Sequence, residues 1–262
     1  MIRFFRRIRQ NLLGENNTRR YLLYAVGEIV LVVLGIVIAL QIDNWNEWRQ
    51  ERELEQLVLE QLQEDYQSNL EQLNQRVYLR RTIIDASYSV LEMTDHPEGV
   101  NRDSLIAKLS ILLIDPTFDP IENDMSNSGN LRLITNRKLK HLLSNWTSDI
   151  VAVQEIEQNW SSIVNSQLQS TLTGLGISRD LAHHFANDMD LDWQLERERN
   201  FEKQTIGRSR QGASVEEIAR SKELEGLVSY AITYNVGANL ESETVVNRIQ
   251  EILDLIKEEI DE

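Results

Sequence analysis

The stretch AVGEIVLVVLGIVIAL, residues 25–40, decides how this 262-residue chain is organised, because it holds one carboxylate, Glu28, in an otherwise apolar run. The wider apolar run, residues 21–42, is about 33 Å long as an α-helix, which matches the hydrocarbon core of a bilayer. Its Ile, Val and Leu side chains outweigh the roughly 3 kcal/mol that a central acid costs on insertion. We therefore predict a single transmembrane helix over residues 18–43. A cleaved signal peptide is the alternative, but the run is too long for one and no small-x-small cleavage motif follows it.

The distribution of charge around this run predicts its orientation. Residues 1–20 carry six arginines and one acid, whereas residues 43–262 carry 21 basic and 40 acidic side chains. The positive-inside rule therefore places the N-terminus in the cytoplasm and residues 44–262 outside it. In a Gram-negative cell the chain would lie in the inner membrane with a periplasmic domain. So acidic a domain repels phosphate backbones, which excludes nucleic acid as a partner.

The segments that flank the apolar run are typical of membrane interfaces. Residues 1–17 mix arginines with Ile, Phe and Leu at helical spacing, which predicts a cytoplasmic basic amphipathic segment that lies on the lipid headgroups. Arg19 and Arg20 precede the run, and Trp45 and Trp48 follow it. We expect these four residues to anchor the helix at the two interfaces, with membrane lipid as a partner.

Two stretches resemble a known family. RQNLLGENNTRRYLLYAVGEIVLVVLGIVIALQIDNWNE (residues 9–47) and MSNSGNLRLITNRKLKHLLSNW (residues 125–146) are similar to an uncharacterised family of single-pass inner-membrane proteins from Bacteroidota. The resemblance implies the same topology and host lineage, with Gly27, Glu28, Ile29 and the NWNE segment as signature positions. It implies no activity and no active-site residues.

The rest of the chain has the composition of long helices. Its three prolines fall within residues 97–120, and residues 36–96 and 130–173 contain neither glycine nor proline. Apolar residues from Leu59 to Ile84 recur at spacings of three, four or seven, so the transmembrane helix is expected to continue to about Met93, with a break near residues 43–46 as an alternative. We predict an all-α fold, in which one N-terminal transmembrane helix leads into a long-helix bundle or coiled coil.

Several further elements are expected. Residues 94–101 should turn the chain, residues 103–114 should form a short helix, and residues 115–120 a loop. Gly129 is expected to adopt a left-handed turn. A second long helix is predicted over residues 136–172. A capping box at Ser214 and Glu217 should open a last helix, which residues 237–239 are expected to interrupt.

The sequence contains no recognisable catalytic motif. It has no P-loop, HExxH, nucleophile elbow or dinucleotide-binding glycine pattern, and no cysteine. The spacing of Asp180, His184 and Asp188 would place three possible metal ligands on one helix face. We favour the interpretation that they are ordinary polar residues on the surface. A calcium loop is the alternative to a solvated acidic loop for four further carboxylates, Asp115, Asp119, Glu122 and Asp124. We expect that the protein is not an enzyme and that it binds no metal and no cofactor.

Glu28 shares a helix face with small residues. On a helical wheel Tyr24, Glu28, Gly35 and Ala39 fall together, and Gly35 with Ala39 forms a small-xxx-small pair that lets another helix approach closely. Intramembrane acids usually face protein or water rather than lipid, so we place Glu28 in a helix–helix contact. The alternative is that Glu28 reaches the inner interface near Arg19 or Arg20.

Two classes of function agree with this pattern. The first is a membrane-anchored periplasmic scaffold or accessory protein that forms a homo-oligomer, or binds another membrane protein, through its transmembrane helix. The second is a proton-coupled membrane subunit that uses Glu28, since the topology resembles that of stator and energy-transducing proteins. Those proteins carry aspartate in the span, and the flagellar type adds a peptidoglycan-binding domain that is not recognisable here. A chemoreceptor-like sensor is disfavoured because no second span returns to the cytoplasm.

Overall fold

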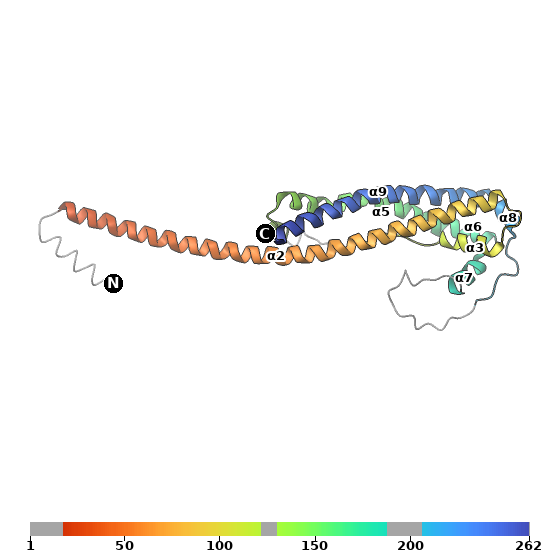
Figure 1. Cartoon of the computed structure of the whole chain (residues 1–262), viewed down its shortest axis with the longest axis horizontal. Coiled ribbons are helices and arrows are strands. Elements are labelled where there is room, and N and C mark those ends of the chain that lie inside the picture. Colours follow the sequence, from red (N-terminus) through yellow and green to blue (C-terminus); the bar gives the residue numbers. More distant parts are fainter. Residues whose placement is uncertain (1–17, 122–129, 188–205, 262) are drawn as a thin grey trace. The chain divides into compact units, whose positions relative to one another are not determined.

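A computed structural model describes residues 18–121, 130–187 and 206–261 (Figure 1). Across these three ranges the regular structure is entirely helical, which confirms the all-α prediction. Residues 1–17 and Gly129 lie outside the described residues, so the amphipathic segment and the left-handed turn predicted there stay predictions.

The chain divides into two compact units, residues 1–58 and residues 59–262. Helix α2 (Thr18–Asp95) begins in the first unit and continues without interruption into the second, so the alternative of a break near residues 43–46 is wrong. In the first unit, every residue from 26 to 50 is exposed. Of the described helices, α2 is the one that is long and apolar enough to cross a membrane. No residue in its most apolar 18-residue stretch is buried.

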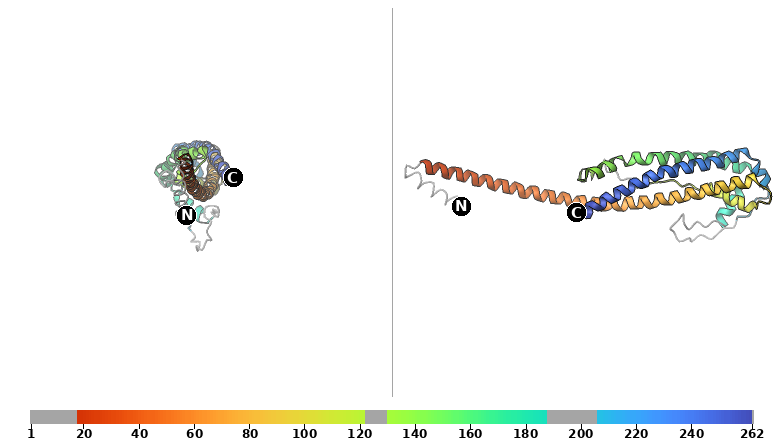
Figure 2. Two further views of the ribbon diagram at one scale, coloured as in Figure 1. Left: turned by 90° about the vertical axis from the view of Figure 1, so that its left-hand side faces the viewer. Right: turned by 45° about the horizontal axis from the view of Figure 1, so that its top comes forward.

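The second unit is a bundle of long helices with short helices at one end. The long members are the second half of α2, α5 (Arg137–Ile163) and α9 (Lys222–Asp261), which lie side by side in Figures 1 and 2. The short helices gather where α2 ends and α9 begins, namely α3 (Arg102–Ile111), α6 (Gln169–Gly174), α7 (Ser178–Asn187) and α8 (Val215–Ala219). A 3-10 turn, η1 (Asn130–Arg132), precedes α5.

The apolar repeat of α2 forms one wall of the core, as the spacing predicts. Leu59, Leu62, Tyr66 and Leu73 are buried, whereas the predicted members Leu70, Val77 and Ile84 are half-buried. Beyond Leu73 the buried positions Arg80, Ile83, Ser87 and Val90 follow at steps of seven, three, four and three, which is the heptad pattern of helices that pack at a shallow angle.

The second predicted long helix contains an irregular turn. Asn136 caps it by accepting hydrogen bonds from the backbone N–H groups of Lys138 and Leu139. α5 passes at Val164 into a π-helical turn, η2 (Val164–Leu168), before α6 resumes the α-helix. A π turn holds one extra residue, and nothing in the apolar spacing revealed it. Gly176, at φ 69°, ends this region in the left-handed conformation.

The loop after α3 is part of the core. Residues 115–120 have no regular structure, which confirms the predicted loop, but Phe118 is 1% exposed. Asn69 on α2 holds the loop at Ile121: its Oδ1 accepts from the Ile121 N–H (2.7 Å) and its Nδ2 donates to the Ile121 carbonyl (3.2 Å). The loop therefore packs against α2 and contributes Phe118 to the interior of the bundle.

The C-terminal region confirms one prediction and corrects two others. Ser214 and Glu217 form the predicted capping box, but the helix that they open is the short α8, which ends at Ala219, and the last helix begins separately at Lys222. The interruption expected at residues 237–239 is wrong, because α9 runs straight through them. A glycine inside a helix costs only about 1 kcal/mol, and packing of the buried residues Asn235, Ala238 and Ser242 outweighs that cost.

Candidate functional site

The predicted membrane face of α2 is not covered by any other part of the chain that the structure describes. Glu28, Gly35 and Ala39 lie within about 40° of one another around α2 and all three are exposed. A Cβ atom added at Gly35 would meet no other atom within 4 Å. The helix thus presents a carboxylate beside a shallow surface on which another helix can pack closely.

The predicted anchor residues are placed only in part. Trp45 and Trp48 are each 61% exposed on α2. Tyr24, Arg19 and Arg20 belong to the same helix, but their side chains lie outside the described residues. The assignment of Arg19, Arg20, Trp45 and Trp48 to the membrane interfaces, and of Tyr24 to the helix face of Glu28, stays a prediction.

A buried ionic group crosses the middle of the bundle. Arg80 on α2 is fully buried and forms an ion pair with Glu157 on α5, which is also buried. Its guanidinium also donates to Ser242 Oγ (2.8 Å) and Asn239 Oδ1 (3.3 Å) on α9, and the second Glu157 oxygen accepts from the Phe118 N–H (3.0 Å). Burial, with the nearby charge of Arg76, lowers the pKa of Arg80 to about 10, so Arg80 remains charged at neutral pH.

This ionic group interrupts the apolar interior. One core cluster lies on the side of the short helices and includes Ile83, Trp160 and Ala231. Buried residues on the other side, such as Leu73, Val153 and Val245, do not belong to it. Arg80 and Glu157 therefore fix which turns of α2, α5 and α9 face one another, since a shifted helix would leave a buried charge unpaired.

Asp180 joins three segments at the end with the short helices. Its carboxylate accepts from the Arg102 guanidinium (2.8 Å) on α3 and from the Ser209 N–H (2.8 Å), and Arg102 also donates to the Ala213 carbonyl (2.9 Å). Burial alone would raise the pKa of Asp180, but these hydrogen bonds and the charges of Arg102 and Arg208 lower it below its ordinary value. Asp180 is 3% exposed, so the interpretation of a surface polar residue is wrong for it.

The other weak metal patterns are only partly described. Asp188, Glu122 and Asp124 lie outside the described residues. Thr117 Oγ1 donates to Asp115 (2.5 Å), and the Asp119 N–H donates to Gln72 (2.9 Å). Within residues 18–121, 130–187 and 206–261, no group of three His, Asp or Glu side chains is placed to hold a metal ion.

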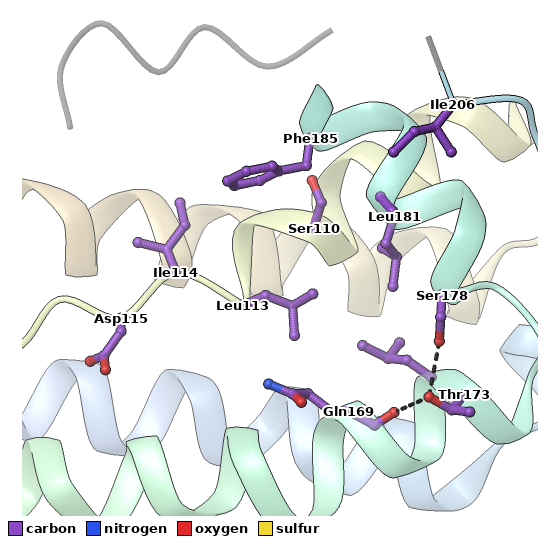
Figure 3. Close-up of a pocket in the computed structure, with 12 residues that line it drawn as sticks. Ser110, Leu113, Ile114, Asp115, Gln169, Thr173, Ser178, Leu181, Phe185 and Ile206 are labelled. Atoms are coloured by element: carbon purple, nitrogen blue, oxygen red, sulfur yellow. Dashed lines mark hydrogen bonds between the residues drawn. The ribbon is translucent and has the colours of Figure 1, made fainter. Parts of the chain in front are cut away.

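The bundle also contains a cavity of about 700 Å³ that the sequence did not reveal (Figure 3). It lies between the end of α3, helix α6 and helix α7. Most of its lining is apolar, including Leu113, Leu172, Leu181 and Phe185. The pattern of Leu181 and Phe185, four residues apart, was the available signal, but the polar composition of residues 177–212 obscured it.

Comparisons with known proteins place only the N-terminal part of the chain. No curated protein and no solved structure matches the sequence. One protein family matches a stretch of the chain that begins at Glu28, covers most of α2 and ends at the start of α3. Over residues 28–102 the chain matches a protein family that is described as a family of unknown function, DUF6090, which agrees with its resemblance to an uncharacterised family.

Proposed function

We propose that this protein is a non-enzymatic, membrane-anchored scaffold or accessory protein that self-associates through α2. The observation that carries the proposal is the complete exposure of the apolar part of α2. A helix in the core of a soluble protein buries such a surface, because each exposed Val, Leu or Ile side chain forfeits roughly 1.5–3 kcal/mol of burial free energy. Ten such side chains lie between Ile29 and Leu40. A bilayer is the environment that accommodates all of them.

The same helix supports self-association. Since α2 is the one candidate span among the described residues, a helix that faces Glu28 in the membrane must come from another chain. The open surface at Gly35 and Ala39 lies next to that carboxylate, so a second copy packed there would bring two Glu28 side chains close together. Each carboxyl group would then need a hydrogen bond across the contact, or a cation of another membrane protein, as its partner.

The non-enzymatic part of the proposal rests on the surroundings of the ionic groups. Arg80 and Glu157 are buried and pair with one another, and the Asp180 carboxylate binds Arg102 and Ser209. Each of these groups has a structural partner in place of a substrate.

The proposed orientation predicts the outcome of a fusion experiment. The six arginines of residues 1–20 keep the N-terminus in the cytoplasm, so the domain that follows is periplasmic. Alkaline phosphatase fused after residue 262 should be active, because this enzyme folds only outside the cytoplasm. A fusion that is made stably but is inactive would overturn the orientation, while β-galactosidase at the same position serves as the opposite reporter.

The proposed contact predicts the behaviour of α2 variants. Gly35→Leu should shift the detergent-solubilised protein towards the monomer, because the larger side chain keeps a second helix away. Gly27→Leu is the matched control, since Gly27 has equally open surroundings and lies about 80° from Gly35 around the helix. Analytical ultracentrifugation measures both variants, and an equal response from the two would contradict the assigned face.

Glu28 variants separate the scaffold from the proton-coupled alternative. Glu28→Gln keeps the hydrogen-bonding shape of a protonated acid and should preserve assembly, whereas Glu28→Ala should weaken it by roughly 1 kcal/mol. In a proton-coupled subunit, Glu28→Gln would preserve assembly yet abolish the ion-dependent activity. A Glu28→Gln chain that assembles and complements a deletion strain therefore supports the scaffold.

A further inference from the structure

The cavity between α3, α6 and α7 has the size and construction of a small-molecule site. Its volume of about 700 Å³ falls within the roughly 300–1,000 Å³ of ligand pockets. Three separate elements form its walls, so it is not the groove of one helix pair. Phe185 is 50% exposed and Ile206 is 37% exposed, which leaves apolar surface on the cavity wall open to solvent.

The hydroxyl groups that line the cavity already donate their hydrogens to other groups of the protein. Ser110 Oγ donates to the Ala107 carbonyl (2.7 Å) and Thr173 Oγ1 donates to the Gln169 carbonyl (2.8 Å). Thr173 Oγ1 also lies 2.9 Å from Ser178 Oγ, and since Thr173 has spent its hydrogen, Ser178 is the donor in that contact. These three hydroxyl groups therefore offer a ligand lone pairs only.

The charge of the lining agrees with this hydrogen-bond pattern. Asp115 lies at one end of the cavity, and the Thr173–Ser178 pair lies at the other (Figure 3). A carboxylate only accepts hydrogen bonds, and Asp115 retains acceptor capacity beyond the bonds from Thr117 and Ser161. The whole chain carries a formal charge of −15. An anionic ligand is thus disfavoured, and a cation that donates hydrogen bonds is favoured.

We propose that this cavity binds an elongated apolar molecule that ends in an ammonium group. The ammonium lies beside Asp115 and donates to its carboxylate. The hydrocarbon part extends along Leu113, Leu172 and Leu181 and is covered by the ring of Phe185. This site is independent of α2 and of the proposed self-association.

The experiment compares three ligands that share one hydrocarbon chain. The full chain in phosphatidylcholine nanodiscs is titrated calorimetrically with n-hexylammonium, 1-hexanol and hexanoate, and binding to empty nanodiscs is subtracted. We expect hexylammonium to bind once per chain and about tenfold more tightly than hexanoate, because Asp115 attracts one charge and repels the other. Hexanol should lie between them. Hexanoate binding as tightly as hexylammonium, or no binding by any of the three, would overturn the proposal.

Variants locate the binding within the cavity. Ala182→Trp fills the cavity from α7 and should abolish binding, whereas Ala152→Trp, exposed on α5 outside the lining, should not change it. Asp115→Asn should weaken hexylammonium about fivefold, the upper range for an exposed ion pair, and leave hexanol unchanged. Asp119→Asn removes a charge from the same loop outside the lining and should have no effect.

Two results would contradict these assignments. Binding retained by Ala182→Trp would show that the amine binds the acidic surface at large. An equal loss from Asp115→Asn and Asp119→Asn would show that long-range charge, and not contact with Asp115, attracts it. Phe185→Ala, a change at a half-exposed position, should weaken all three ligands and confirms the location if Ala182→Trp fails to fold.

Discussion

Replacement of Glu157 with alanine is expected to destabilise the bundle by about 3–5 kcal/mol, because it leaves the Arg80 charge buried without its carboxylate partner. The same change leaves the Phe118 N–H without its acceptor. Ser242 and Asn239 still bind the guanidinium, but they supply no opposite charge. Denaturant unfolding of the full chain, followed by far-ultraviolet circular dichroism, measures the loss.

Two variants test the cause of that loss. Glu155→Ala removes an exposed acid from the same helix and should change stability by less than about 0.5 kcal/mol. Arg80→Leu combined with Glu157→Leu removes both charges and should recover most of the stability lost in Glu157→Ala. If Glu157→Ala and Glu155→Ala unfold at the same denaturant concentration, the buried ion pair does not stabilise the bundle.

Asp180→Asn should have the next largest effect, a loss of roughly 1.5–3 kcal/mol at pH 7, which is the range for hydrogen bonds to a charged group. The amide keeps the shape of the side chain but loses the charge that Arg102 binds. Asp103→Asn, which breaks the exposed pair with Arg208, is the matched control and should cost no more than about 1 kcal/mol. Thermal and denaturant unfolding of the full chain compares the two variants.

The effect of Asp180 should depend on pH with a defined sign. The pKa of Asp180 is lowered in the folded chain, so its contribution is fully present above the unfolded value of about 3.9 and disappears as the pH falls through the folded pKa. The gap between the natural chain and Asp180→Asn should therefore narrow below about pH 4. A gap that is the same at pH 7 and pH 3 would show that Asp180 acts through packing and not through its charge.

The repeats of apolar residues predicted most of the helices. The stripe from Leu59 to Leu73 and the capping box at Ser214 lie where the spacing placed them, because burial and local hydrogen bonds act within a few residues of one another. The π turn at Val164–Leu168 and the straight passage of α9 through Gly237 were missed. Both depend on packing against other helices, which spacing within one segment does not contain.

The pairing of the buried polar side chains could not be predicted from the sequence, for a related reason. Arg80 and Glu157 have the composition of a solvated helix face, and only the fold brings them together across 77 residues. Asp180 was singled out by its spacing to His184, yet its partner Arg102 lies 78 residues away in the chain. The predicted membrane face at Glu28, by contrast, lies within one helix, so its composition can be read from the sequence alone.

The position of Arg80 also affects the time at which the bundle can form. Its partner Ser242 follows 162 residues later in the chain, on the last helix. At about 5–20 residues per second, a ribosome needs roughly 8–30 s to make that stretch. Glu157, 77 residues after Arg80, is made about halfway through this interval, and until then water hydrates the Arg80 guanidinium. Helix α2 is therefore made well before it can pack in its final place. For a domain proposed to cross a membrane, this order of synthesis delays folding until almost the whole chain is available for export.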